Sequence, residues 1–187
     1  MPNLKLKLIF EFDIEKKIMK KIVILLVIAL TFSSCEKDDI CDANTPTTPR
    51  LIIDFYDASN PTELKNVINL KVIGFGMADD KPLATFNSVS TIELPLKTTE
   101  TSTKYRLILN STSTSGSLNE DVLQFDYTHE DVFVSRACGY KTIFKLNSPN
   151  GVTETDAANP DGFWIQDINI ETTNIETENE THIKIYF

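Results

Sequence analysis

Hydrophobic and polar residues alternate along much of the chain after residue 50, with the period of two that is typical of half-buried β-strands. In the clearest example, segment 123–128, Leu, Phe and Tyr alternate with Gln, Asp and Thr. Further segments with strand character are 51–56, 69–75, 92–96, 104–109, 132–134, 140–145 and 182–187. No stretch of 12 residues after Cys35 has a convincing helical period of 3.6, so the pattern predicts an all-β fold.

Clusters of turn-forming residues separate several of these segments, at 57–61, 78–82 and 147–151. Pro95 lies within the 92–96 segment and favours an edge position, because proline has no N–H to donate to a neighbouring strand. Eight or nine short strands at spacings of about 10–15 residues are typical of sandwiches and barrels. We expect an antiparallel β-sandwich of immunoglobulin-like or transthyretin-like type.

A different hydrophobic pattern precedes this region. Lys20 and Lys21 are followed by 11 mostly apolar residues at 22–32 and then by Ser33, Ser34 and Cys35. This order of charged, apolar and small residues is that of a secretory signal, here ending in the cysteine of a lipoprotein signal. The apolar run is too short to span a bilayer, which takes about 20 residues. The pattern predicts that Cys35 becomes the lipidated first residue of the mature protein.

The signal divides the chain into four parts. Residues 1–18 carry three acidic residues and do not fit a basic signal start, so we interpret them as a mis-assigned extension before Met19. Residues 19–34 are then the signal peptide. Residues 35–49 are the lipidated N-terminus and a short tether, and 50–187 are the β-sandwich domain.

Charged residues directly after Cys35 suggest where the anchor faces. Lys37, Asp38 and Asp39 resemble the surface-export signal of Bacteroidetes lipoproteins, in which a lysine and two acids follow the lipidated cysteine. An acidic run after an anchor is also common as a solvated tether. The resemblance implies an outer-membrane protein that faces the cell exterior, with the periplasmic face as the alternative.

Two cysteines, Cys41 and Cys138, remain when Cys35 is lipidated. In an oxidising compartment two cysteines most simply pair, and their spacing is not that of a CxxC redox motif. We therefore predict a Cys41–Cys138 disulfide. Only five residues separate Cys35 from Cys41, so the tether reaches about 20 Å at about 3.5 Å per residue.

The charge balance narrows the set of partners. Residues 1–34 hold six of the 18 basic and three of the 27 acidic residues, so residues 35–187 hold 12 and 24. A net charge near −12 argues against nucleic acid, because phosphates require Lys and Arg. The expected partners are the membrane, through the lipid, and an envelope protein or glycan.

Residues that could support chemistry are few and scattered. His129 and His182 lack metal-ligand spacing, and we expect both to be solvated side chains on strand faces. The 156–162 loop is rich in oxygen ligands but lacks the spacing of an EF-hand. Trp164 favours a core position, and in an exposed position it could contact a sugar ligand. We predict no catalytic residues, no metal and no cofactor.

Several short motifs together resemble a family of uncharacterised lipoproteins from flavobacteria. These motifs are Cys35 with its acidic followers, Cys41, 48–51 (TPRL), 94–96 (LPL), 137–140 (ACGY) and 185–187 (IYF). The resemblance implies location and fold, and it implies no activity. We expect a non-catalytic accessory or interaction module of the envelope. A glycan-binding module and an envelope hydrolase are the alternatives.

Overall fold

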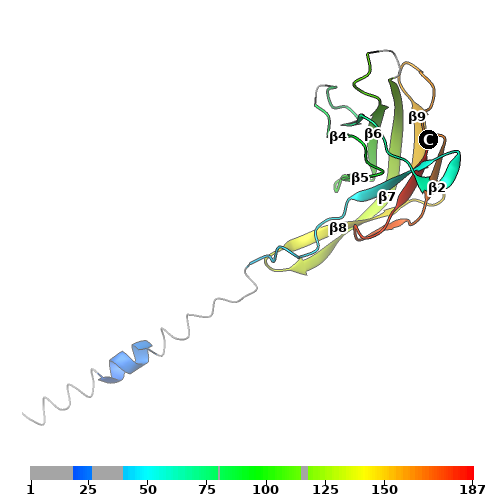
Figure 1. Cartoon of the computed structure of the whole chain (residues 1–187). Helices are drawn as coiled ribbons and strands as arrows, with labels where there is room; N and C mark the ends of the chain where they lie inside the picture. The colour runs from blue at the N-terminus through cyan, green and yellow to red at the C-terminus, as the bar shows by residue number, and fades with distance from the viewer. Residues whose placement is uncertain (1–18, 27–39, 80, 115–117) are drawn as a thin grey trace, which may run out of the picture. The chain divides into compact units, whose positions relative to one another are not determined.

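A computed structural model describes residues 19–26, 40–79, 81–114 and 118–187. Residues 19–26 form a helix, and residues 42–187 form one compact unit of β-structure (Figure 1). The all-β sandwich prediction is confirmed, with twelve strands in the described residues where eight or nine were expected. The additional strands are short, and they were not visible as alternating segments.

Five strands form the first sheet. They are β1 (Leu51–Asp57), β2 (Asn60–Leu64), β5 (Thr91–Leu94), β10 (Asp167–Ile170) and β12 (Ile183–Tyr186). β1 is central: it pairs with β12 on one side, and with both β5 and β2 on the other. The β1–β12 pairing is parallel, the one exception to antiparallel pairing among the described strands. β5 pairs only with β1, which confirms the edge position predicted from Pro95.

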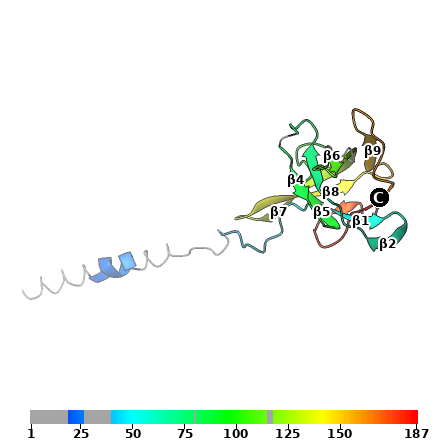
Figure 2. The same cartoon turned by 45° about the horizontal axis from the view of Figure 1, so that its top comes forward.

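Seven strands form the second sheet. They are β3 (Leu70–Gly74), β4 (Ala84–Phe86), β6 (Ser102–Leu109), β7 (Asn119–Ser135), β8 (Gly139–Leu146), β9 (Val152–Asp156) and β11 (Asn174–Ile175). The segments at 123–128 and 132–134 belong to one 17-residue strand, β7. Its first half pairs with β6 and β9, and its second half pairs with β8. The second half forms a hairpin with β8 that extends beyond the sandwich (Figures 1 and 2).

The core lies between the two sheets. Alternate residues of the strands point inward, as the period of two predicts, and most are fully buried. Both sheets contribute: Leu51, Ile53, Phe55, Ile92, Leu94, Ile183 and Ile185 come from the first, and Leu70, Val72, Leu107, Leu123, Phe125, Tyr127, Phe144 and Leu146 from the second. Burial of these side chains in contact with one another supplies the main stabilisation of the fold.

The predicted turn at 147–151 does not reverse the chain. β8 and β9 run in the same direction along the same side of β7, and residues 147–151 loop out opposite Asp126. The Asn147 N–H donates to the Asp126 carbonyl, and the Asp126 N–H donates to the Gly151 carbonyl. A Cβ on Gly151 would lie 2.4 Å from the Asn147 carbonyl oxygen, so only glycine fits there. The loop therefore lies between two strands, β8 and β9, that continue in the same direction along one side of β7.

Cys41 and Cys138 form a disulfide, as predicted. Cys138 lies in the turn between β7 and β8, at the outer end of the hairpin. The segment that follows Cys41 is bound to β8, because the Thr142 N–H donates to the Thr48 hydroxyl oxygen at 2.9 Å. Pro49 is buried, and the Arg50 guanidinium pairs with Glu178 at 2.9 Å.

We predict that the disulfide stabilises the folded domain without specifying its sheets. Residues 36–187, expressed in an oxidising compartment, should have no free thiol under denaturing conditions. The bond closes a loop of about 96 residues, so its reduction should lower the free energy of unfolding by roughly 2–4 kcal/mol. Released chain ends should fray only up to residue 47, because Thr48 and Pro49 keep their contacts. Quantitative thiol labelling and denaturant titration measure both effects, and two free cysteines would contradict the prediction.

Candidate functional site

The outer half of the β7–β8 hairpin carries an exposed pair of aromatic rings. Phe133 and Tyr140 lie directly opposite each other in the register, with ring centroids 5.4 Å apart in an edge-to-face arrangement. They are 57% and 68% exposed. Sequence analysis placed each residue in a strand but did not pair them. The short connection between the two strands, from Ser135 to Gly139, predicts a hairpin and could have indicated that Phe133 and Tyr140 face each other.

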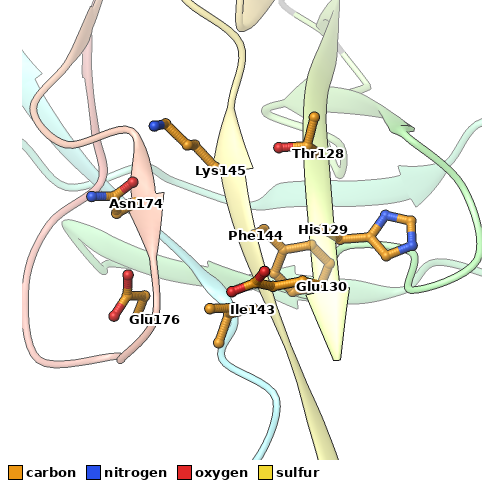
Figure 3. A pocket seen from close by; sticks show the side chains of 8 residues that line it. All are labelled: Thr128, His129, Glu130, Ile143, Phe144, Lys145, Asn174 and Glu176. Carbon is orange, nitrogen blue, oxygen red and sulfur yellow. The ribbon is translucent and has the colours of Figure 1, made fainter. Parts of the chain in front are cut away.

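One face of the same hairpin is hollowed into a depression of about 350 Å³ (Figure 3). Strands β7, β8 and β11 supply its lining, which consists of Thr128, His129, Glu130, Ile143, Phe144, Lys145, Asn174 and Glu176. The strand register brings these residues from three strands together, because Lys145 of β8 lies opposite both Thr128 of β7 and Asn174 of β11. The exposed polar groups are two carboxylates, one ammonium, one amide and one hydroxyl.

This depression lacks an activated nucleophile or a paired general base. His129 and Glu130 leave β7 in opposite directions, as Figure 3 shows and as strand alternation requires. The His129 ring lies on the core-facing side instead, with its centroid 6.4 Å from that of Tyr127 and 6.5 Å from that of Phe144. The depression is therefore suited to hydrogen bonding with a polar partner rather than to acid–base chemistry by its histidine.

His182, predicted to be solvated, is completely buried, so that prediction is wrong. The Ile52 N–H donates to Nδ1 of His182 at 2.9 Å, which requires Nδ1 to be unprotonated. Burial lowers the pKa of His182, because the charged imidazolium would lose its hydration. The ring thus acts as a neutral acceptor that joins β1 to the start of β12. His182 is in phase with Lys184 and Tyr186, which is why alternation assigned it to the solvent-facing side, but the strand itself begins only at Ile183.

Two neighbouring carboxyl groups, one fully buried and one half-buried, lie on the inner face of the second sheet. Asp121 is fully buried, and its Oδ2 accepts the backbone N–H groups of Trp164 and Ile165 at 3.0 and 2.8 Å. Burial raises the pKa of Asp121, and burial together with the neighbouring Asp121 carboxyl raises the pKa of Glu154 on the adjacent strand β9. Asp121 is in phase with Leu123 and Phe125, so strict alternation could have placed it inward.

Asp121 therefore has a structural function. It satisfies two backbone donors of the segment that leads into β10, and its proximity raises the pKa of Glu154. Asp156, in the loop considered for calcium, accepts N–H groups of Ala157, Asp161 and Gly162. Those bonds organise the loop. Among the described residues, no group of three or more His, Cys, Asp and Glu side chains is arranged to hold a metal ion.

Trp164 lies in the core. Its side chain is 8% exposed, and its Nε1–H donates to the Leu107 carbonyl at 3.1 Å. Its ring contacts those of Phe55 and Phe187, with centroids 6.3 and 5.4 Å away. The core position expected for Trp164 is thus confirmed, and a ring held in this way leaves no exposed face on which a sugar could stack.

Tyrosines, in contrast, do lie side by side on the outer face of the first sheet. Tyr56 and Tyr186 are opposite each other in the parallel β1–β12 pairing, with ring centroids 5.6 Å apart. Both are partly exposed, and the Lys184 ammonium lies 5.4 Å from the Tyr56 ring centroid. Tyr186 also lines a depression of about 620 Å³ together with Gln166, Asp167 and Asn169. An aromatic ring beside amide and carboxylate groups is chemically able to bind a sugar.

The predicted lipidation and export residues lie outside the described residues. These are Cys35 and the Lys37, Asp38 and Asp39 triplet, together with residues 1–18 and most of the apolar part of the signal. Within the described part of the chain, no helix is long and apolar enough to cross a membrane.

Comparison with models of known protein families gives a match over most of the β-domain. A model described as a family of unknown function (DUF6452) matches residues 69–187, from β3 to the C-terminus. The matched region contains the 94–96, 137–140 and 185–187 motifs, and the expectation of a family without an assigned activity is confirmed. No curated protein and no solved structure matches the chain.

We predict that the Asp121–Glu154 pair makes stability depend on pH. The pKa of Glu154 is raised from 4.5 to about 7, so between these values the folded protein binds more protons than the unfolded chain. Stability therefore falls as the pH rises through this window. Glu154→Gln should increase the free energy of unfolding at pH 8 by about 1 kcal/mol, after allowance for solvent screening, and should change it little at pH 4.5.

Denaturant titrations from pH 4.5 to 8 measure this difference. His182 has the opposite pH dependence, because its pKa is lowered, but it contributes equally to both proteins and cancels in the comparison. Glu130→Gln, at an exposed position, is the matched control and should retain the wild-type pH profile. An unchanged profile for Glu154→Gln would contradict the raised pKa of Glu154.

Proposed function

Since the chain belongs to this family of unknown function (DUF6452), we propose from its own residues that it is a lipid-anchored, surface-exposed interaction module of the bacterial outer membrane. The observation that carries the proposal is the lipoprotein-type signal, Lys20–Lys21 followed by the apolar run and Cys35. The closing motifs of the chain and its resemblance to flavobacterial lipoproteins agree with this assignment.

The disulfide supports the anchoring proposal on mechanical grounds. Cys41 follows Cys35 after only five residues and is bonded to Cys138 at the end of the hairpin. A lipid on Cys35 would therefore hold the folded domain within about 20 Å of the membrane. Such a short connection suits a protein that acts at the membrane surface, and it gives the domain little freedom to search away from it.

A non-catalytic role accounts for the polar groups best. The buried Asp121 carboxyl is engaged in holding the segment before β10, and the carboxylates of the hairpin depression are separated from His129 by the sheet. The exposed features are a shallow polar depression and an aromatic pair, which favour binding over hydrolysis. An envelope hydrolase is the less supported alternative.

Glycan binding is the second candidate, and the Tyr56–Tyr186 pair favours it. The two rings are partly exposed next to a depression lined by Gln166, Asp167 and Asn169. Against it, the rings are tilted toward each other by 34°, and Lys184 covers part of one of them. A protein or membrane partner therefore remains our first choice.

Lipidation predicts that Cys35→Ala abolishes membrane retention. The acyl chains would be the only apolar anchor left after signal cleavage, and each buried methylene contributes about 0.8 kcal/mol. Fractionation of cells that express the full chain, followed by immunoblotting, measures the distribution. Cys138→Ser is a matched control that removes the disulfide and should remain with the membrane. A processed Cys35→Ala variant that still sediments with membranes would sink the proposal.

Surface exposure makes a separate prediction. Replacement of Lys37, Asp38 and Asp39 by alanine should reduce cleavage by protease added to intact cells, because the export signal would be lost. Accessibility is compared before and after permeabilisation of the outer membrane. Equal cleavage of the two proteins on intact cells would remove the export argument and leave lipidation untouched.

A further inference from the structure

The exposed aromatic pair lies on the same face of the hairpin as part of the core. On that face Tyr127 and Phe144 are buried, and their strands continue outward through the Asp131–Thr142 pair to Phe133 and Tyr140. The Asp131 carboxylate accepts the Thr142 hydroxyl at 2.7 Å. The hairpin extends beyond the sandwich here, so the outer rings lack the cover that the inner ones receive (Figures 1 and 2). Two large rings left uncovered side by side indicate a contact surface.

The end of the hairpin also differs from the rest of the domain in charge. Residues 132–142 contain Arg136 and Lys141 and no acidic residue, whereas residues 35–187 contain twice as many acids as bases. We name residues 132–142 the aromatic tip. Its own residues add no negative charge that would repel phosphate headgroups, and the acids adjoining it are Asp131 before it and Asp42 beside the disulfide.

We propose that the aromatic tip inserts into the headgroup region of the membrane that carries the lipid anchor. This step rests on the proposed lipidation of Cys35. The disulfide joins Cys41 to Cys138 inside the tip, and five residues connect Cys41 to Cys35. The anchor is thus attached to the same end of the domain that carries the uncovered rings and the basic residues.

The chemistry of the tip fits an interfacial position. Tyrosine places an apolar ring in the interface and keeps its hydroxyl in water, and phenylalanine contributes apolar area to the acyl boundary. Arg136 is long enough to reach phosphates while its stem stays at the surface. The Lys141 ammonium donates to the Glu176 carbonyl at 3.2 Å and contributes its charge from there. Two rings bind a bilayer weakly by themselves, but the tether keeps their effective concentration at the membrane high. Insertion would orient the domain, with the β7–β8 hairpin pointing into the lipid.

Fluorescence quenching by lipids tests this proposal. The chain 35–187 contains every described strand and both cysteines of the disulfide, so Cys35 is its single free thiol. Cys35 is coupled to a maleimide headgroup in vesicles of phosphatidylethanolamine and phosphatidylglycerol. Because this link is made in vitro, the result does not depend on whether cells lipidate Cys35. Emission is recorded with and without shallow doxyl-labelled lipid, and the wild-type signal of buried Trp164 is subtracted.

Phe133→Trp is the test variant, and Phe75→Trp is the matched control. Phe75 is also exposed, at 62%, and its N–H donates to the carbonyl of Lys104 on β6. Lys104 pairs with Gln124 of β7, which lies nine residues before Phe133 on the same strand. At about 3.3 Å per residue the two sites are about 30 Å apart along the strand. We expect a blue-shifted emission and about twofold or stronger quenching for Phe133→Trp, and no quenching for Phe75→Trp. Tyr140→Trp is a second test variant, in case Phe133→Trp does not fold.

Equal quenching at the tip and at position 75 would overturn the insertion proposal and leave the lipid anchor intact. A tip that is not quenched on vesicles but is crosslinked to a protein on intact cells would also overturn it, in favour of a protein partner. An unacylated Cys35 in cells would instead contradict the proposed function. The failures of the two proposals are therefore distinguishable.

Discussion

The backbone hydrogen bonds of β7 are the interaction on which both parts of the domain depend. This strand pairs with β6 over 119–126 and with β9 over 121–125, and its inward side chains there belong to the core. Over 127–135 it pairs with β8, and the hairpin extends past the sandwich. A projecting two-stranded hairpin is marginally stable alone. Here it is continuous with a strand that the core holds in place.

Two further constraints fix that hairpin. The loop at 147–151 lets β8 and β9 follow the same side of β7, with Asp126 hydrogen-bonded at both ends of the loop. At the other end, the disulfide and the Thr48–Thr142 hydrogen bond attach the N-terminal segment to β8. The direction of the hairpin and the entry point of the chain are therefore coupled. Any force that an N-terminal anchor exerts is transmitted to the end of β7–β8.

The sequence was sufficient for the parts of the fold that follow from local periodicity. Segments such as 51–56 and 104–109 became strands because alternate apolar residues had a core to face. The sequence was insufficient where hydrogen bonds to a neighbouring strand keep polar residues in a strand. Residues 129–131 are His, Glu and Asp, yet they continue β7 because β8 supplies a complete set of hydrogen-bond partners. Residues 147–151 have the composition of a turn that reverses the chain. Only the pairing of β8 and β9 with β7 shows that the chain continues in the same direction after the loop.

Features of the site were predictable where they follow from residue type alone, and not where they depend on a partner distant in the sequence. The disulfide followed from the number of cysteines and from the oxidising compartment that the signal predicts. The burial of His182 and the Asp121–Glu154 pair did not, because each depends on a partner distant in sequence, at Ile52 and on β9 respectively. Phe133 and Tyr140 show the same limit: their positions in strands were evident, but their exposure depends on where the opposite sheet ends.

The central claim is that a lipid on Cys35 is linked directly to the end of the hairpin, and intact mass spectrometry of one fragment tests it most directly. The arginines are Arg50, Arg106 and Arg136, so an arginine-specific protease leaves residues 35–50 and 137–187 as fragments. From membranes, without reduction, we predict one species that contains both fragments, joined by the disulfide and acylated on Cys35. A fragment that begins before Cys35, lacks acyl chains or separates from 137–187 without reductant would contradict the account.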